Sequence, residues 1–367
     1  MRGYVKDYNH DGDYPLIGRQ GALCGNLNYG SGQFYATEHA VVVECFAHTN
    51  PRWAFYFLDR MNLNQYATAT AQPGLSVKTI NEVPIFIPPL SEQHRIVAAI
   101  ESTFAVIGEI EQNKTDLQST ITAAKSKIIS LAIRGKLVPQ DPTDEPASVL
   151  LERIRIEGDK LTKSGKIKRG KSESAIFRGD DNSYYAELPK SWAVSELGDV
   201  CEIARGGSPR PIQEFITNDS NGINWIKIGD TKPGNKYITE TQEKIRPEGL
   251  LNSRFVKAGD FLLTNSMSFG RPYILKIDGC IHDGWLVIGD VEKVFTPDFL
   301  YHLLSSDWAY QSMSKVAYGS TVKNLKTDTV KAFAVPLPPL AEQRRIVEAI
   351  EMAYIHLNNI AAMLKEK

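Results

Sequence analysis

The sequence has little that would support a disulfide framework, export or membrane insertion. Its four cysteines, at positions 24, 45, 201 and 280, form no close pair, which argues against a zinc site and against disulfides. The N-terminal residues lack the apolar core of a signal peptide, and no run approaches the roughly 18 to 20 apolar residues of a membrane span. We therefore expect a cytoplasmic protein that binds no metal and no membrane.

Strong positive charge, which marks many nucleic-acid-binding domains, is also absent. The formal net charge is −1. Charge is unevenly placed, however, because residues 160–178 contain seven Lys or Arg and one Glu, a local charge of +6 that leaves −7 for the remainder. Any contact with nucleic acid must therefore come from local clusters or from a partner.

Catalytic motifs are few. The methyltransferase pattern Asn-Pro-Pro-aromatic fails at residues 50–53, which read Asn-Pro-Arg-Trp, and no G-x-S-x-G elbow occurs. His282 and Asp283 are adjacent, but without a third partner in the sequence they are interpreted as a surface hydrogen-bonding pair. We expect no catalytic residue in this chain.

One segment, residues 165–172 (GKIKRGKS), matches the phosphate-binding pattern G-x-x-x-x-G-K-S. Such a loop requires a buried strand before it and a helix after it, because the helix end supplies the amide donors. Charged residues precede this segment and no helical periodicity follows it. It is therefore interpreted as a solvated linker, and Lys171 as a residue without a role in nucleotide binding.

The most informative feature is an internal repeat. Residues 88–101 (PPLSEQHRIVAAIE) and 338–351 (PPLAEQRRIVEAIE) agree at 11 of 14 positions across an offset of 250 residues. So long a period indicates a duplicated module rather than a solenoid.

A heptad pattern follows each proline pair and predicts a coiled coil; the first helix, from Ser91 to Ile133, would be roughly 60 Å long. The alternative is that each amphipathic helix packs on its own domain. The seam positions are Ile96, Ile100, Ile107, Ile110, Leu117, Ile121, Ile128, Leu131, Ile346, Ile350, Leu357 and Ile360.

The two copies differ in length before the repeat. Residues 259–271 correspond to residues 14–26, but about 75 residues separate Leu188 from Leu262, whereas 15 precede Leu16. Roughly 60 residues are therefore missing from the front of the first copy. Apolar runs predict a last strand at Val83–Ile87 in the first copy, and a helix at Pro297–Met313 in the second.

Several polar residues at predicted loop tips could contact DNA. In the segment 204–211 (ARGGSPRP), glycines permit close approach to a phosphate, and arginines can pair with phosphates or read guanine edges. The candidates are Arg205, Gly206, Gly207, Ser208, Arg210, Asn265, Ser266, Arg271, Lys323, Asn324, Arg19 and Gln20.

These elements together resemble the specificity subunit of type I restriction-modification enzymes. The resemblance is carried by PPLSEQHRIV and PPLAEQRRIV, RGKLVPQDP with its basic connector, LPKSWAVSELGDV, ARGGSPRP and YPLIGRQGALCGNLNYGSGQFYATEH. It implies an α+β protein with two target-recognition modules, each mixed α/β with small sheets, joined by long antiparallel coiled-coil spacer helices.

By this resemblance, each recognition module reads half of a bipartite target in double-stranded DNA, and the spacer helices dock the modification (methyltransferase) subunits. A restriction (translocase and nuclease) subunit completes the complex. S-adenosylmethionine, ATP and Mg belong to those partners, so no cofactor is expected here. Two copies of the chain could also pair through their spacer helices.

The expected division of the chain follows from the resemblance and from the shortened first copy: 1–88 partial first recognition domain, 89–159 first spacer helix and turn, 160–187 basic linker, 188–337 second recognition domain and 338–367 second spacer helix. A rival interpretation is a truncated coiled-coil protein that docks methyltransferase subunits without productive DNA recognition.

Overall fold

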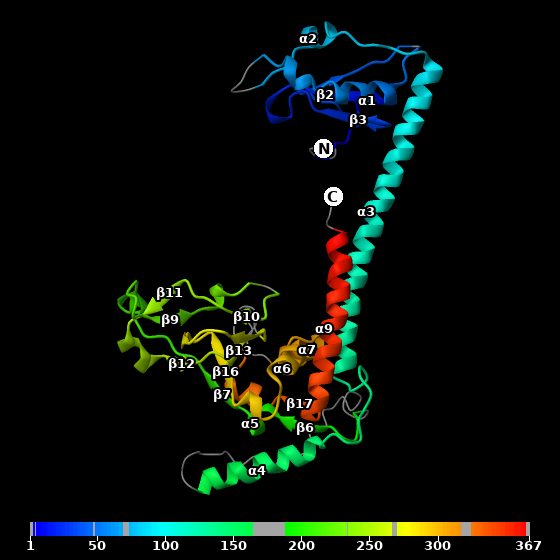
Figure 1. The fold of residues 1–367 in the computed structure, drawn as a ribbon. Helices are drawn as coiled ribbons and strands as arrows, with labels where there is room; N and C mark the ends of the chain where they lie inside the picture. Colours follow the sequence, from blue (N-terminus) through cyan, green and yellow to red (C-terminus); the bar gives the residue numbers. More distant parts are fainter. Residues whose placement is uncertain are drawn as a thin grey trace. The chain divides into compact units, whose positions relative to one another are not determined.

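The computed structural model describes residues 3, 5–46, 48–68, 73–163, 188–232, 234–265, 270–316 and 324–364 (Figure 1). The chain divides into two compact units, residues 1–116 and 117–367, each considered by itself below. Within these described ranges, no helix is long and apolar enough to cross a membrane.

The first unit is a small sheet covered by a helix. Strands β3, β2 and β5 form an antiparallel sheet, and α1 packs on β2 and β3 over a core that includes Ile17, Leu58 and Leu63. The elements are β1 (His10–Asp11), β2 (Tyr14–Gly18), β3 (Leu27–Gly30), β4 (Gln33–Phe34), β5 (Ala40–Val42), α1 (Pro51–Arg60), α2 (Val77–Asn81) and the first part of α3 (Leu90–Ala132).

The second unit contains two larger sheets. Its described strands pair in the orders β10-β14-β13-β16-β7, β12-β15-β9-β11-β8 and β17-β6. The strands are β6 (Ala193–Glu196), β7 (Glu202–Arg205), β8 (Ile216–Thr217), β9 (Ile223–Ile226), β10 (Tyr237–Ile238), β11 (Glu243–Ile245), β12 (Arg254–Val256), β13 (Phe261–Thr264), β14 (Pro272–Leu275), β15 (Gly279–Ile281), β16 (Trp285–Gly289) and β17 (Ala334–Leu337).

Helices of the second unit pack around the first of these sheets. Phe261 and Leu286 from the sheet share one buried core with Phe299, Ile346 and Ile350 from the helices. The helices are the last part of α3, α4 (Ala147–Lys163), α5 (Leu197–Val200), α6 (Pro297–Leu304), α7 (Asp307–Val316), α8 (Thr327–Lys331) and α9 (Leu340–Met363).

The last part of α3 lies antiparallel to α9 (Figure 1). The Lys125 ammonium donates to the amide oxygen of Asn358 at 2.6 Å, and the Tyr354 hydroxyl donates to the main-chain oxygen of Lys125. Further along α3, Ile129 shares the core with Ile350, so rising numbers on α3 meet falling numbers on α9. Because α9 also packs on α6, the pair formed by α3 and α9 is joined to the rest of the second unit.

The predicted seam residues fall into three groups by exposure. Ile121, Ile346 and Ile350 are buried, and Ile96, Ile100, Ile128, Leu131 and Leu357 are half-buried. Ile107, Ile110, Leu117 and Ile360 are exposed in the single chain.

A buried glutamine fixes each spacer helix to its module. The Gln343 side chain accepts a hydrogen bond from the Thr296 amide at 2.8 Å and donates to the carbonyl oxygens of Val294 and Pro338, both at 3.0 Å. Thr296 is the N-cap of α6, so this one side chain joins the start of α9 to the start of a module helix.

The same arrangement recurs in the first unit. Gln93 accepts from the amide of Asn50, the N-cap of α1, at 2.7 Å, and donates to the carbonyl oxygens of His48 and Pro88. The repeat therefore preserves a specific joint between the helix and the module.

Three predictions about elements are wrong in detail. Residues 83–87 form no strand, because within the described first unit no strand lies beside them. The helix at Pro297–Met313 is two helices, since the Ser306 hydroxyl accepts from the Ala309 amide and starts α7 anew. Helix α4 continues to Lys163, into the expected linker, and residues 164–187, including the GKIKRGKS segment, lie outside the described residues.

His302 provides a test of the core of the second unit. It is buried in α6, its Nε2 has no hydrogen-bond partner among the described residues, and burial lowers its pKa from 6.5 to about 4. The unfolded chain therefore binds the proton more tightly, so the stability that depends on neutral His302 is present above pH 6.5 and lost as pH falls toward 4.

We predict that His302→Leu removes this dependence. Between pH 7 and pH 5 the free energy of unfolding of the original chain should fall by about 2 kcal/mol more than that of the variant. Urea unfolding at both pH values measures this, and parallel losses in the two proteins would contradict the assignment.

Candidate nucleic-acid interface

Three loops of the second unit meet at one edge of the sheet β10-β14-β13-β16-β7. Arg205 ends β7 opposite Leu286, and Thr264 ends β13 opposite Trp285, the first residue of β16. Strand β14 begins at the same edge, because Pro272 lies opposite Leu263. Antiparallel pairing therefore gathers the loops that follow β7 and β13 with those that precede β14 and β16.

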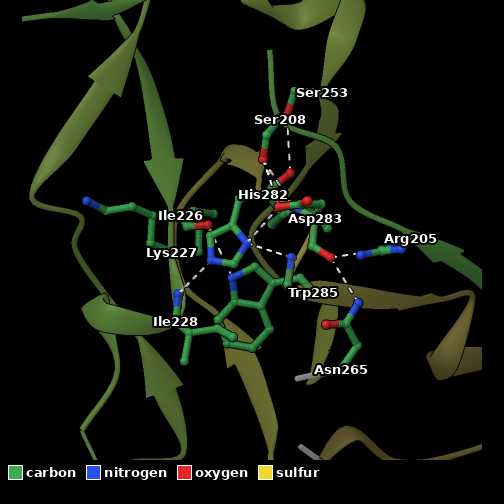
Figure 2. Close-up of polar contacts among 12 residues, drawn as sticks. Arg205, Ser208, Ile226, Lys227, Ile228, Ser253, Asn265, His282, Asp283 and Trp285 are labelled. Atoms are coloured by element: carbon green, nitrogen blue, oxygen red, sulfur yellow. Dashed lines mark hydrogen bonds and ion pairs between the residues drawn. The ribbon is translucent and has the colours of Figure 1, made fainter. Parts of the chain in front are cut away.

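Asp283 is the centre of the hydrogen bonds at this edge (Figure 2). Its carboxylate accepts from the Ser208 hydroxyl at 3.0 Å and pairs with the Arg210 guanidinium at 3.4 Å. Its main-chain oxygen accepts from Arg205 Nε and from the Asn265 side-chain amide, both at 2.9 Å. One residue thus holds side chains from two of the loops.

The charge of Asp283 suits this position. Burial raises the pKa of its carboxyl, but the Ser208 hydrogen bond and the positive charge of Arg205 outweigh burial and hold the pKa below the usual range. The carboxylate therefore stays ionised at neutral pH and pairs with Arg210, while Arg205 bonds to the main-chain oxygen.

His282 is held neutral beside it. Its two ring nitrogens lie 3.1 Å from the Ile228 amide nitrogen and 2.6 Å from that of Gly284. A neutral ring can accept from one of these amides and a protonated ring from neither, and burial also lowers the His282 pKa. Since the Ser208 hydroxyl bonds to Asp283 rather than to His282, these three residues do not form the nucleophile and base pair of a hydrolase.

The glycines of the loop serve packing inside the protein. A Cβ on Gly206 would lie 2.2 Å from the main-chain oxygen of His282, and one on Gly207 would lie 2.8 Å from that of Asn252. Their amides donate to the carbonyl oxygens of Trp285 and Ile281. From the sequence, these glycines are expected to permit close approach to a phosphate. In the structure, their amide groups already have partners within the protein.

The predicted DNA-contacting residues divide by exposure. Arg205, Arg210, Arg271 and Asn324 are exposed in the second unit. Asn265 is buried and Ser208 is half-buried, and both bond to Asp283. Ser266 and Lys323 lie outside the described residues.

Asn265 links another loop to this edge. Its main-chain oxygen accepts from the Leu325 amide at 2.8 Å, which brings the exposed Asn324 beside the same loops. The side-chain oxygen of Asn265 is buried without a hydrogen-bond partner among the described residues.

Arg19 and Gln20 belong to the first unit. Gln20 is exposed and forms a β-bridge with Gly74, whereas Arg19 is half-buried and donates to the main-chain oxygen of Glu38.

Sequence reasoning missed two cations. Arg254, exposed at the start of β12, donates to the main-chain oxygen of Arg205 at 3.0 Å, and Lys227 pairs with Glu243 at 2.6 Å near His282. Their neighbours in the sequence contain no loop signal, because only pairing between distant strands brings them here. In the described ranges, no three His, Cys, Asp or Glu side chains are grouped to hold a metal ion.

Comparison with known proteins identifies the family. The chain belongs to the type I restriction modification DNA specificity domain family, whose sequence pattern matches residues 1–118 and 189–366. DNA recognition is the role of this family, and the resemblance predicted from the sequence is confirmed.

Three relatives show how far the likeness extends. The EcoprrI specificity subunit of Escherichia coli is 54% identical over 28% of this chain and 25% of its own length. A putative type I restriction enzyme specificity subunit of Haemophilus influenzae is 24% identical over 98% of this chain and 80% of its own length. The EcoEI specificity subunit of Escherichia coli is 29% identical over 64% of this chain, and the match covers 40% of that subunit.

Solved structures confirm the fold class. The HsdS subunit from Thermoanaerobacter tengcongensis aligns with all of this chain and 79% of its own, with a TM-score of 0.58 at 18% identity. A chain from a structure of the type I R-M system aligns with 99% of this chain and 80% of its own, with a TM-score of 0.61 at 17% identity. Mixed α/β modules with small sheets and a long helix are common to this fold.

Gly206 and Gly229 form a matched pair for testing the loop. We predict that Gly206→Ala lowers the free energy of unfolding by about 1 to 3 kcal/mol, because the new Cβ must displace the main chain at His282. Gly229→Ala should change it by less than about 0.5 kcal/mol, since nothing lies within 4 Å of its added Cβ. Urea unfolding compares the two, and equal effects would refute the tight contact.

Proposed function

We propose that the second unit reads one half of a bipartite double-stranded DNA target through the edge of the sheet that Asp283 organises. The observation that carries this proposal is the gathering of exposed Arg205 and Arg210 around one residue, Asp283, with Arg254 bonded to the same loop. Guanidinium groups held in this way can pair with phosphates or read guanine edges bidentately.

The local character of this cluster accounts for binding by a chain of net charge −1. Arg210 is 80% exposed and its partner Asp283 is part-exposed, so a phosphate or base edge can reach the guanidinium. Buried Asn265 and half-buried Ser208 act by positioning, because each holds Asp283 in place.

We also propose that the chain carries out no chemistry and docks partners. The modification subunits, and the S-adenosylmethionine they use, would supply methyl transfer, while a restriction subunit would supply ATP- and Mg-dependent translocation and cleavage. The exposed seam residues of α3 and α9 would face these subunits or a second copy of the chain. In this proposal the second recognition domain spans 188–337 and the partial first one 1–88, and the complex acts in the cytoplasm.

The rival function is docking of methyltransferase subunits without productive DNA recognition. It is favoured by the first unit, in which the described residues form only one three-stranded and one two-stranded sheet. The rival predicts copurification with the modification subunits but no dependence of DNA affinity on the arginines.

DNA affinity of the copurified complex separates the two. We predict that Arg205→Ala and Arg210→Ala each weaken binding of a mixed-sequence 40-base-pair duplex about tenfold, and that each lowers the salt-dependence slope by about 1 for a lost phosphate contact. Fluorescence anisotropy across a salt series measures both quantities.

Lys293→Ala is the control. It removes one exposed positive charge at the opposite end of β16, where Lys293 pairs with Asp290. Its affinity should remain close to that of the original chain. Equal losses in all three variants would show nonspecific attraction, and no loss in any of them would support the rival function.

A further inference from the structure

The two copies of the module differ in the segment that directly precedes the spacer helix. In the second copy this segment is a paired strand, and in the first copy the described residues provide no partner for it. In the second unit, β17 pairs antiparallel with β6, and both Val335 and Leu337 are fully buried. At the offset of 250 residues, Ile85 and Ile87 of the first unit take the same places, yet they are 41% and 53% exposed. Phe86 between them is 84% exposed.

Residues 84–87 keep the alternation of N–H donors that an antiparallel strand requires. Pro336 has no N–H, so the ladder bonds of β17 must come from the alternate residues Val335 and Leu337. At the same offset, Pro84 corresponds to Ala334. Ala334 and Pro336 alternate along β17 with the residues that donate to the ladder, so a proline at position 84 removes no ladder donor. No backbone hydrogen bond among the described residues involves 84–87.

A buried polar contact beside the β6–β17 pair also has no counterpart in the described part of the first unit. Buried Glu342 accepts from the indole N–H of Trp192, which directly precedes β6, at 2.9 Å. The equivalent Glu92 is exposed, and its carboxylate forms no hydrogen bond or ion pair with the described part of the chain.

A repeated arginine shows the same difference between the two units. Arg345 forms two hydrogen bonds with the Asp144 carboxylate, at 3.2 and 2.6 Å, from the loop that covers the start of α9. Arg95, its equivalent, is exposed. The helix start at Pro89–Arg95 thus has the same apolar, acidic and basic groups as the start of α9, but no described segment covers them.

We propose that residues 84–87 and Glu92 form a binding site that takes a tryptophan-bearing β-strand of the type seen at Ser191–Glu196 from a second polypeptide. The strand would add antiparallel to residues 84–87, and its indole N–H would donate to Glu92. The strand β6 of the chain itself is already paired with β17, so it is not free to fill this site.

A synthetic peptide of residues 188–200 (LPKSWAVSELGDV) tests the site with the full chain. Titration calorimetry should show one saturable site, weakened at least about tenfold by Trp192→Ala in the peptide and by Ile87→Asp in the chain. Leu251→Asp, at an exposed position of the second unit, is the control and should change nothing. Hydrogen exchange should slow at the Ile85 and Ile87 amides and not at that of Phe86.

Three results would overturn the proposal. The first is the absence of saturable binding at millimolar peptide. The second is binding that Ile87→Asp leaves unchanged, which would mean that the peptide exchanges with β6 of the second unit. The third is a doubled mass of the chain alone that Ile87→Asp abolishes, since the site would then be filled by a second copy. Because none of these readouts involves DNA, they are independent of the proposed recognition function.

Discussion

The structure depends on one buried side chain, the glutamine of the repeated segment. Gln343 and Gln93 each join the start of a spacer helix to the N-cap of a module helix through three hydrogen bonds. A buried amide that loses its partners costs about 1 to 3 kcal/mol, so the joint favours one orientation strongly. A specificity subunit needs this, because a reading surface is useful only at a fixed position on its spacer helix.

The reading surface divides its work among residues in a similar way. Asp283, Ser208 and Asn265 are engaged within the protein and set the positions of the loops, while Arg205 and Arg210 keep their guanidinium groups exposed. Gly206 permits this by letting the loop lie directly against the chain at His282. Packing therefore constrains the loop closely, whereas the two guanidinium groups stay accessible.

The sequence predicted the features that depend on short-range patterns. The spacer helix near 91–133 follows from periodicity in neighbouring residues. The role of Asp283 could not be predicted, since its partners lie 18 to 78 residues away in the sequence. The strand expected at 83–87 failed for a related reason: its apolar pattern is suitable, but a strand also requires a partner.

The most direct measurement of the central claim, that this chain contains one complete reader, is methylome mapping in a host that expresses it with its modification subunits. The account predicts specified bases of a single kind, either as a lone half-site or, when two copies pair, as a palindrome with identical halves. An asymmetric bipartite site with two different halves would contradict it, because the first unit would then read DNA unaided.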